Sequence, residues 1–419
     1  MRLLYKCCCG LDVHRSFVVA NIRRYGIKGK KNLNEVRRFG TMTHDLLELG
    51  DWLKEAGCTH IAIESTGVFW KPIFNVLGSE FEIILVNARH CKSLPGRKTD
   101  VKDCQWLCEL LQHGLLKASF IPPPLIRQLR DLTRQRRQLV GEKTSVVNRI
   151  HKVYQDANIK LSSVISDIMS KSGQEMLERI IQGETDVEKL ADCARGKMKE
   201  KKKELALALE GRVTAHHRFM LSKHLKQLRF LEELIGEFDQ QIDQHIQSGG
   251  EDFFALIPLL TTIPGVDKRS AQEVLAEIGA DMNQFPNEDH LSSWAGVCPG
   301  NNITGGKRKS GKTTKGCVWL KAALGEIAWA ASRTKGTYLT AHYRRICRRR
   351  SKKIAIVASA HTILVIIYHM IKHRLPYREL GDEYFNKVDK EKIKNSMIKR
   401  LEKLGYKVQI QEVVEKKAA

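Results

Sequence analysis

Two aspartates, Asp100 and Asp103, lie three residues apart in the segment PGRKTDVKD and are close enough to act together. On a helix, residues at this spacing share one face, with Cβ atoms about 5–6 Å apart. Carboxylates that close repel each other unless a positive group lies between them. Lys102 or a divalent metal ion could supply that charge. The alternative is a solvated helix start, where acids are favoured by the helix dipole.

Two further acids follow predicted strands. Asp12 ends the apolar run LLYKCCCGLD, and Glu64 ends the short run HIAIES. The first 115 residues alternate in a pattern that predicts three successive strands, then helix, strand, helix, strand and helix. Sites in mixed α/β sheets gather at strand ends, so the four carboxylates can converge. Such oxygen ligands suit one or two Mg²⁺ or Mn²⁺ ions, which support phosphoryl transfer.

Two helices frame these strands. The segment THDLLELGDWLKEAG predicts an amphipathic helix with Thr43 as its N-cap and Gly57 at its end. The segment TDVKDCQWLCELLQHGLL predicts another, with Thr99 as its N-cap. Its inward-facing residues are expected to be Trp106, Leu107, Leu110 and Leu111.

The charge of the chain indicates a polyanionic partner. There are 71 Lys and Arg residues against 47 Asp and Glu, which gives a net charge of +24. Between Ile303 and Lys353 there are fifteen basic residues and one acid, and residues 127–152 add eight basic residues against two acids. This clustering favours nucleic acid over a membrane surface.

Cysteine usage and hydropathy predict an intracellular, cytoplasmic protein without a membrane partner. The eleven cysteines form no C-x-x-C pair, which indicates reduced, mostly buried thiols. The N-terminus lacks the apolar region of a signal peptide. The segment Ile354–Ile371 is barely long enough to span a membrane and contains two histidines, so a buried core or interface helix is expected.

Three stretches now carry a family resemblance: GLDVHRSFVVANI, IAIESTGVFWKPIFNVL and VNARHCKSLPGRKTDVKDCQWLCELLQHGLL. They resemble the DEDD transposases of bacterial insertion sequences, a family that includes Piv-type invertases and bridge-RNA-guided recombinases. The resemblance implies an α/β RNase H-like (RuvC-type) N-terminal domain whose metal-binding acids are Asp12, Glu64, Asp100 and Asp103. Arg97, Lys98 and Lys102 would then contact the nucleic-acid backbone.

The middle of the chain predicts long helices. One covers LIRQLRDLTRQRRQLVGEKTSVVNRIHKVYQDANI, and another covers Lys201–Gln247. The second has apolar residues at coiled-coil spacing, which fits either an intramolecular hairpin or a dimer seam. The segment LLTTIPGVDKRSAQEVLAEIG resembles a helix-hairpin-helix that could present backbone N–H groups to a phosphate, although an ordinary αα-corner is the alternative.

A basic, glycine-rich segment follows, in which four glycines alternate with Lys307, Arg308, Lys309 and Lys312. Glycine permits close backbone approach to phosphate. The alternative is a disordered basic loop, which the flanking segments around Trp294 and Trp319–Trp329 disfavour. The segment matches the second block of the same family, in which a serine forms a covalent bond to DNA. This chain has Thr304 at that position, and Ser310 is a nearby alternative.

The expected organisation is an RNase H-like catalytic domain (1–120), an all-α spacer (121–250), a helical C-terminal transposase domain (251–376) and a charged tail (377–419). The expected function is Mg²⁺- or Mn²⁺-dependent cleavage and exchange of DNA strands at element ends and target. The resemblance adds a guide RNA, a covalent intermediate and a homodimer or higher homo-oligomer. The alternatives are a junction-resolving or simple metal-dependent nuclease that uses water, and a non-enzymatic DNA-binding protein.

Overall fold

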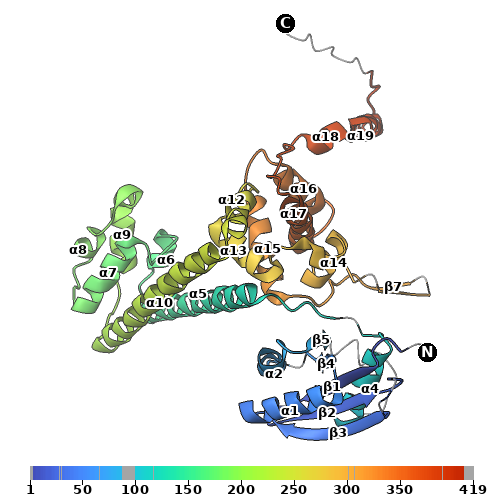
Figure 1. Cartoon of the computed structure of the whole chain (residues 1–419). Helices are drawn as coiled ribbons and strands as arrows, with labels where there is room; N and C mark the ends of the chain where they lie inside the picture. The colour runs from blue at the N-terminus through green and yellow to red at the C-terminus, as the bar shows by residue number, and fades with distance from the viewer. Residues whose placement is uncertain are drawn as a thin grey trace. The chain divides into compact units, whose positions relative to one another are not determined.

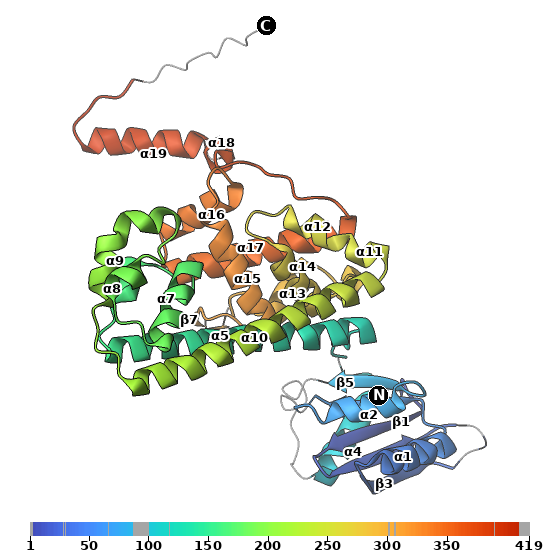
Figure 2. The same ribbon diagram turned by 90° about the vertical axis from the view of Figure 1, so that its left-hand side faces the viewer.

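The chain folds into two compact units, Met1–Ile121 and Pro122–Ala419. Figures 1 and 2 draw this computed structural model. It describes residues 3–27, 29, 31–65, 67–86, 100–116, 118–300, 302–305, 307–388 and 390–409. All ten cysteines within these ranges are free thiols, in agreement with the expectation of reduced cysteines.

The first unit contains a five-stranded mixed sheet. Its strands are β1 (Cys7–Val13), β2 (Phe17–Arg24), β3 (Leu33–Gly40), β4 (His60–Glu64) and β5 (Glu82–Val86), in the order β3-β2-β1-β4-β5. β1, β2 and β3 form an antiparallel meander, whereas β4 runs parallel to both β1 and β5. The predicted α/β class and element order of this region are therefore confirmed.

Helices cover both faces of this sheet, which explains why β1 is apolar almost throughout. Cys7, Cys9 and Leu11 belong to the core shared with α1 (Thr43–Ala56) and α2 (Trp70–Leu77). Cys8 lies on the opposite face and packs against residues of α4 (Asp100–Gln112). Three of the four residues of α4 that were predicted to face inward are buried: Leu107, Leu110 and Leu111. The fourth, Trp106, is partly buried.

The caps of these helices differ slightly from expectation. α1 has Met42 as its N-cap rather than Thr43, because the Asp45 carboxylate accepts the Met42 backbone N–H at 3.1 Å. Gly57 ends α1 in the left-handed conformation, with φ of 76°, as predicted. The predicted N-cap of α4, Thr99, lies outside the described residues.

The second unit is built on an antiparallel pair of long helices, α5 (Pro124–Asp156) and α10 (Ala215–Ser248). Ion pairs between the two helices confirm the direction: Lys143 pairs with Glu232 at 2.8 Å, and Arg136 pairs with Asp239 at 2.5 Å. The apolar face of α10 is buried within this chain, at Leu221, Leu225, Leu228 and Leu231. Of the two predicted alternatives, the intramolecular hairpin is therefore correct for this seam.

Short helices connect the two arms: α6 (Leu161–Val164), α7 (Lys171–Gln182), α8 (Val187–Ala191), η1 (Gly196–Lys201) and α9 (Lys202–Leu209). The predicted continuous helix over Lys201–Gln247 is wrong, because the chain breaks between α9 and α10. At the break, a Cβ on Gly211 would lie 2.6 Å from the Ala157 carbonyl oxygen, so the chain turns tightly against the end of α5. Thr214 then caps α10.

The remaining elements follow α10 along the chain, and all of their helices except the last two contribute to one core with the start of α5 and the end of α10. They are α11 (Glu251–Phe254), α12 (Leu256–Thr261), α13 (Lys268–Ile278), η2 (Met282–Gln284), α14 (Glu288–Ala295), β6 (Asn302–Thr304), β7 (Lys307–Ser310), α15 (Val318–Ala331), α16 (Tyr338–Cys347), α17 (Lys352–His373), α18 (Tyr384–Val388) and α19 (Lys390–Lys403). This unit is helical apart from the two-stranded β6–β7 ribbon, within the residues that the structure describes.

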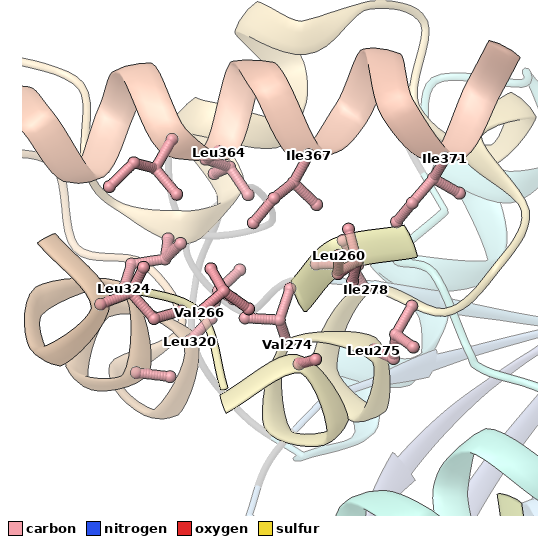
Figure 3. Packing of buried hydrophobic residues seen from close by; sticks show 14 of the residues in the cluster. Leu260, Val266, Val274, Leu275, Ile278, Leu320, Leu324, Leu364, Ile367 and Ile371 are labelled. Carbon is pink, nitrogen blue, oxygen red and sulfur yellow. The ribbon is translucent and has the colours of Figure 1, made fainter. Parts of the chain in front are cut away.

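α17 is the central helix of this core. Figure 3 shows Leu364, Ile367 and Ile371 of α17 facing a layer that includes Leu260 and Leu324. Among the described helices, α17 alone is long and apolar enough to cross a membrane, yet half of its most apolar window is buried inside the protein. The expectation of a buried core helix is thus confirmed.

Candidate active site and nucleic-acid-binding surfaces

Strand pairing brings Asp12 and Glu64 to neighbouring positions. The parallel register of β1 and β4 pairs Leu11 with Ile63. Asp12 and Glu64 are the residues that directly follow this last pair on the two strands. Adjacent strands lie about 4.8 Å apart, and alternate residues share one face. Cys8 and Ala62 pack on the α4 side of the sheet, which places Asp12 and Glu64 on the same side. Two predicted site residues are thus brought together under α4.

Gly10 allows α4 to lie directly on β1. A Cβ at this position would lie 2.3 Å from the Cys104 carbonyl oxygen and 2.6 Å from the Cys108 backbone nitrogen. Burial, and then the nearby Asp12 carboxylate, raise the pKa of the Cys104 thiol to about 12. Asp12 therefore lies close to the residue that directly follows Asp103.

The first turn of α4 contains the other two predicted acids. Asp100 is the first residue of the helix, and Asp103 is partly buried in its first turn. Lys102 lies between them along the chain. Arg97 and Lys98, which were predicted to contact nucleic acid, lie outside the described residues. Asp12, Glu64 and the start of α4, which contains Asp100 and Asp103, therefore lie on one side of the sheet.

His14 is a neighbour of the site that the sequence reasoning missed. Its Nε2 lies 3.1 Å from Asp12 Oδ2, and the Asp12 side chain is only 15% exposed. The imidazole stacks on Phe17 at 4.5 Å, and the Arg38 guanidinium lies 3.8 Å from the Phe17 ring centre. The sequence signal for this contact was the spacing Asp-x-His at the end of a strand. Residues two apart in a strand share a face, so this spacing places His14 on the same side as Asp12.

The donor set of this site fits a hard divalent cation. Carboxylate oxygens are the ligands preferred by Mg²⁺ and Mn²⁺, and the close approach of α4 at Gly10 brings its acids to β1. A different group, His44, Asp45 and Glu48, has ligand atoms within 4.8 Å of one another. That group lies on α1, where the Asp45 carboxylate already accepts the Met42 backbone N–H, so it is not the predicted site.

The basic, glycine-rich segment forms a β-ribbon. Thr304 is the last residue of β6 and pairs with Lys307 of β7, with Gly305 at a positive φ of 56° in the turn. The base is held by backbone hydrogen bonds, from Gly300 N–H to the Lys312 carbonyl at 2.8 Å and from Thr314 N–H to the Cys298 carbonyl at 3.2 Å. The alternative of a disordered loop is therefore wrong for the described residues.

The predicted basic residues lie along this ribbon. Lys307 and Lys312 are exposed, and Arg308 and Lys309 are residues of β7. Ser310 ends β7, opposite Asn302 at an irregular position of the ladder. Thr304 thus lies beside the turn, whereas Ser310 lies at the other end of its strand.

The predicted helix-hairpin-helix consists of α12, a turn at Pro264-Gly265 and α13. Gly265 has a φ of 88°, and a Cβ there would lie 2.5 Å from the Ala331 backbone nitrogen, so the turn packs against α15. The first turn of α13 is capped by Asp267, which accepts the Ser270 N–H at 2.8 Å. A phosphate at this helix terminus would have to replace that carboxylate, so phosphate binding here stays a prediction.

The arginines of α5 are used inside the protein. Arg134 makes a bidentate ion pair with Glu277 of α13, at 2.7 and 2.8 Å, and Glu277 is only 3% exposed. Arg130 donates to the backbone carbonyls of α13 at Ala276 and Glu277, and Cys317 donates to the same carboxylate at 3.2 Å. This part of the positive charge therefore stabilises the fold.

Comparisons with known proteins agree with the sequence motifs. A family model described as a transposase, of the DEDD IS110 type, matches residues 9–159, and the model of the transposase IS116/IS110/IS902 family matches residues 257–344. The two matches together cover more than half of the chain and include the four acids and Thr304.

Curated relatives point in the same direction. A "Probable family 20 transposase" of Pseudomonas aeruginosa is 28% identical over 163 residues, which cover 38% of this chain and 46% of the relative. A "Pilin gene-inverting protein" of Moraxella lacunata and one of Moraxella bovis are each 29% identical over 153 residues, or 36% of this chain and 47% of each relative. The chain spans about half the length of these relatives. On the two family matches and these relatives, the chain belongs to the IS110-type DEDD transposase family.

Proposed function

We propose that the protein is a DNA recombinase that cleaves and exchanges the strands of an insertion sequence. The observation that carries the proposal is the placement of Asp12 and Glu64 on adjacent strands, on the face covered by α4. Membership of the transposase family supports the same activity. The sheet order and the α4 packing also support an RNase H-like (RuvC-type) fold for the first unit.

The four acids are the proposed metal ligands. Asp12, Glu64, Asp100 and Asp103 would hold Mg²⁺ or Mn²⁺ at the scissile phosphate. When bound there, the metal withdraws electron density from phosphorus and stabilises negative charge on its oxygens. His14 holds Asp12 through the 3.1 Å contact, which fixes the orientation of that carboxylate.

The proposed nucleophile is Thr304. Its hydroxyl oxygen loses its proton and forms a bond to phosphorus while a bridging P–O bond breaks, and the oxygen of the departing DNA end takes up a proton to become a sugar hydroxyl. The β-branched side chain restricts χ1, so the attacking oxygen has fewer accessible positions than that of a serine. Gly305 beside it gives the turn its positive φ, and Lys307 is its partner across the ribbon, where a cation favours phosphate.

Membership of the transposase family supports two further proposals. Because the acids and Thr304 belong to different units of the chain, one catalytic centre would combine the acids of one subunit with the threonine of another. A homodimer or a higher oligomer would then be the active form. Target choice would come from a guide RNA that pairs with the element end and the target.

The acids are tested first by four single variants: Asp12→Asn, Glu64→Gln, Asp100→Asn and Asp103→Asn. Each is expected to abolish strand exchange while nucleic-acid binding stays largely intact, because each removes a ligand without removing a basic residue. The matched control is Glu48→Gln, in the exposed carboxylate group of α1. Full activity in any two of the four variants would refute the metal-site assignment.

The nucleophile is tested by denaturing gel analysis of protein–DNA adducts formed on labelled substrate with Mg²⁺. Thr304→Ala should lose the adduct, Thr304→Ser should retain or increase it, and Ser310→Ala should have much less effect. An adduct that persists in Thr304→Ala and is lost in Ser310→Ala would assign the role to Ser310. Cleavage without any adduct in the wild type would favour a junction-resolving or simple metal-dependent nuclease that uses water.

The ribbon is tested by the salt dependence of DNA binding. Replacing Lys307, Arg308 and Lys309 with alanine should flatten the log–log slope, because each phosphate contact contributes roughly −0.9 for duplex DNA. An unchanged slope would place the ribbon away from the backbone. Binding without any metal-dependent cleavage in the wild type would favour a non-enzymatic DNA-binding protein.

A further inference from the structure

The turn between α16 and α17 concentrates positive charge outside the β6–β7 ribbon. Seven of the ten residues from Arg344 to Lys353 are Arg or Lys, and no acid occurs between Glu326 and Glu379. This segment is called the basic turn below. It joins two helices that pack against each other, and its backbone is ordered by hydrogen bonds such as Arg350 N–H to the Ile346 carbonyl at 2.9 Å.

Most of its cations face solvent. Six are exposed and make no ion pair with any described acid: Arg344, Arg348, Arg349, Arg350, Lys352 and Lys353. Arg345 differs, because its guanidinium lies 4.7 Å from the ring centre of Phe385 in α18. Arg345 therefore helps to hold the C-terminal segment on α16, and the other six cations form the available surface.

The cations of the basic turn differ from three arginines of α5, which are ion-paired within the protein. Arg130, Arg134 and Arg136 of α5 all contact carboxylates of the same unit, with nitrogen–oxygen distances of 2.5–3.4 Å. Within one unit, therefore, one basic segment is neutralised by the fold and the other is not. Lys352 and Lys353 also lie in the first turn of α17, where the helix dipole disfavours cations. An anionic partner would relieve both the mutual repulsion and this unfavourable placement.

We infer that the basic turn is a second nucleic-acid-binding surface, separate from the ribbon, that holds the phosphodiester backbone of DNA or structured RNA. Arginine and lysine side chains on a preformed turn fit backbone phosphates, because they require no particular base sequence. The inference rests on the proposed nucleic-acid substrate, but it concerns binding and requires neither the metal site nor Thr304.

The test compares two triple variants of the full chain that lose the same charge. One replaces Arg348, Arg349 and Arg350 with alanine. The control replaces three exposed lysines of η1 and α9 that pair with no described acid: Lys199, Lys201 and Lys203. Binding is measured over a salt series, in EDTA, with a fluorescent random-sequence DNA duplex and with an RNA hairpin of unrelated sequence. Thermal unfolding confirms that each variant is folded.

The arginine triple variant is expected to flatten the log–log salt slope on duplex DNA by up to about 2.7, since three phosphate contacts at roughly 0.9 each are lost. The lysine control should keep the wild-type slope. A flatter salt slope for the DNA duplex alone identifies DNA as the partner, and a flatter slope for the RNA hairpin alone identifies RNA. A flatter slope for both probes identifies a surface that binds either backbone.

Three outcomes would overturn the inference. If the arginine triple variant kept the wild-type salt slope for both probes, the basic turn would lie away from nucleic acid. If the salt slope flattened equally in the arginine and lysine triple variants, the effect would be one of net charge alone. Binding of the same variants to phosphatidylserine vesicles is measured as well. If the arginine triple variant kept both salt slopes but no longer bound the vesicles, the basic turn would be assigned to a lipid surface. Because the measurement is made in EDTA, a failure of the proposed catalysis in the acid variants leaves this result interpretable.

Discussion

Gly10→Ala should disturb the candidate active site without touching any of its acids. The added Cβ would lie 2.3 Å from the Cys104 carbonyl oxygen, 2.6 Å from the Cys108 nitrogen and 3.1 Å from the Cys108 Cα. All three are backbone atoms of α4, so no side-chain rotation can relieve the contact. α4 must therefore move away from β1, and its first turn, with Asp100 and Asp103, moves with it.

The expected cost follows from two opposing terms. Overpacking a tight interior contact destabilises by about 1–3 kcal/mol. Replacing glycine lowers the entropy of the unfolded chain, which offsets up to about 1 kcal/mol. A net loss of about 1–2 kcal/mol corresponds to roughly 5- to 30-fold faster exchange of amides that open with this unit.

Hydrogen exchange followed by mass spectrometry measures this in peptides from β1 and α4, alongside metal-dependent cleavage. Gly50→Ala in α1 is the matched control, because its closest neighbour is the flexible end of the Leu77 side chain, at 3.1 Å. The control should change exchange much less and leave cleavage intact. Wild-type exchange in α4 together with wild-type cleavage in Gly10→Ala would refute the argument that this glycine sets the position of the acids.

Three other consequences of the structure can be measured. Glu277→Ala leaves Arg134 without its bidentate partner and should destabilise the second unit by roughly 3 kcal/mol in urea unfolding, the low end for buried pairs because Arg134 is 31% exposed; Glu277→Gln should cost less. Burial opposes the shift, but hydrogen bonds from Lys268 and Gln272 lower the pKa of Asp243 below its ordinary value of 3.8. The ionised Asp243 carboxylate therefore stabilises the folded state above pH 3.8, and this stabilisation is lost as the pH falls through the lowered pKa of the folded state. The free energy of unfolding of Asp243→Asn should accordingly depend less on pH below about pH 4. Burial raises the pKa of the Cys108 thiol, so native protein should resist alkylation by iodoacetamide at this residue until it unfolds, and rapid native modification would contradict the packing of α4.

Local patterns in the sequence were sufficient for much of the first unit and for helix α17 of the second. Apolar runs bounded by turns predicted the strands, and the position of Asp12 and Glu64 at strand ends predicted their convergence, which the β1–β4 register supports. Gly57 predicted the end of α1 because a left-handed terminus favours glycine. The histidines of α17 and its modest length predicted a core helix despite its hydropathy. These features depend on neighbours in sequence, so the sequence alone was informative.

Features that depend on the choice of a distant partner required the tertiary structure. The heptad spacing of α10 fits a partner in the same chain or in another, and only the path of the chain back along α5 decided for the same chain. The arginines of α5 and of the basic turn look alike in sequence, yet Glu277 reaches Arg134 from 143 residues away, while the basic turn has no described acid to pair with. Residue type and spacing determined which charges and apolar faces this protein has. Which of them it uses internally was decided by the fold, because ion pairs and helix packing require proximity in space that local spacing does not specify.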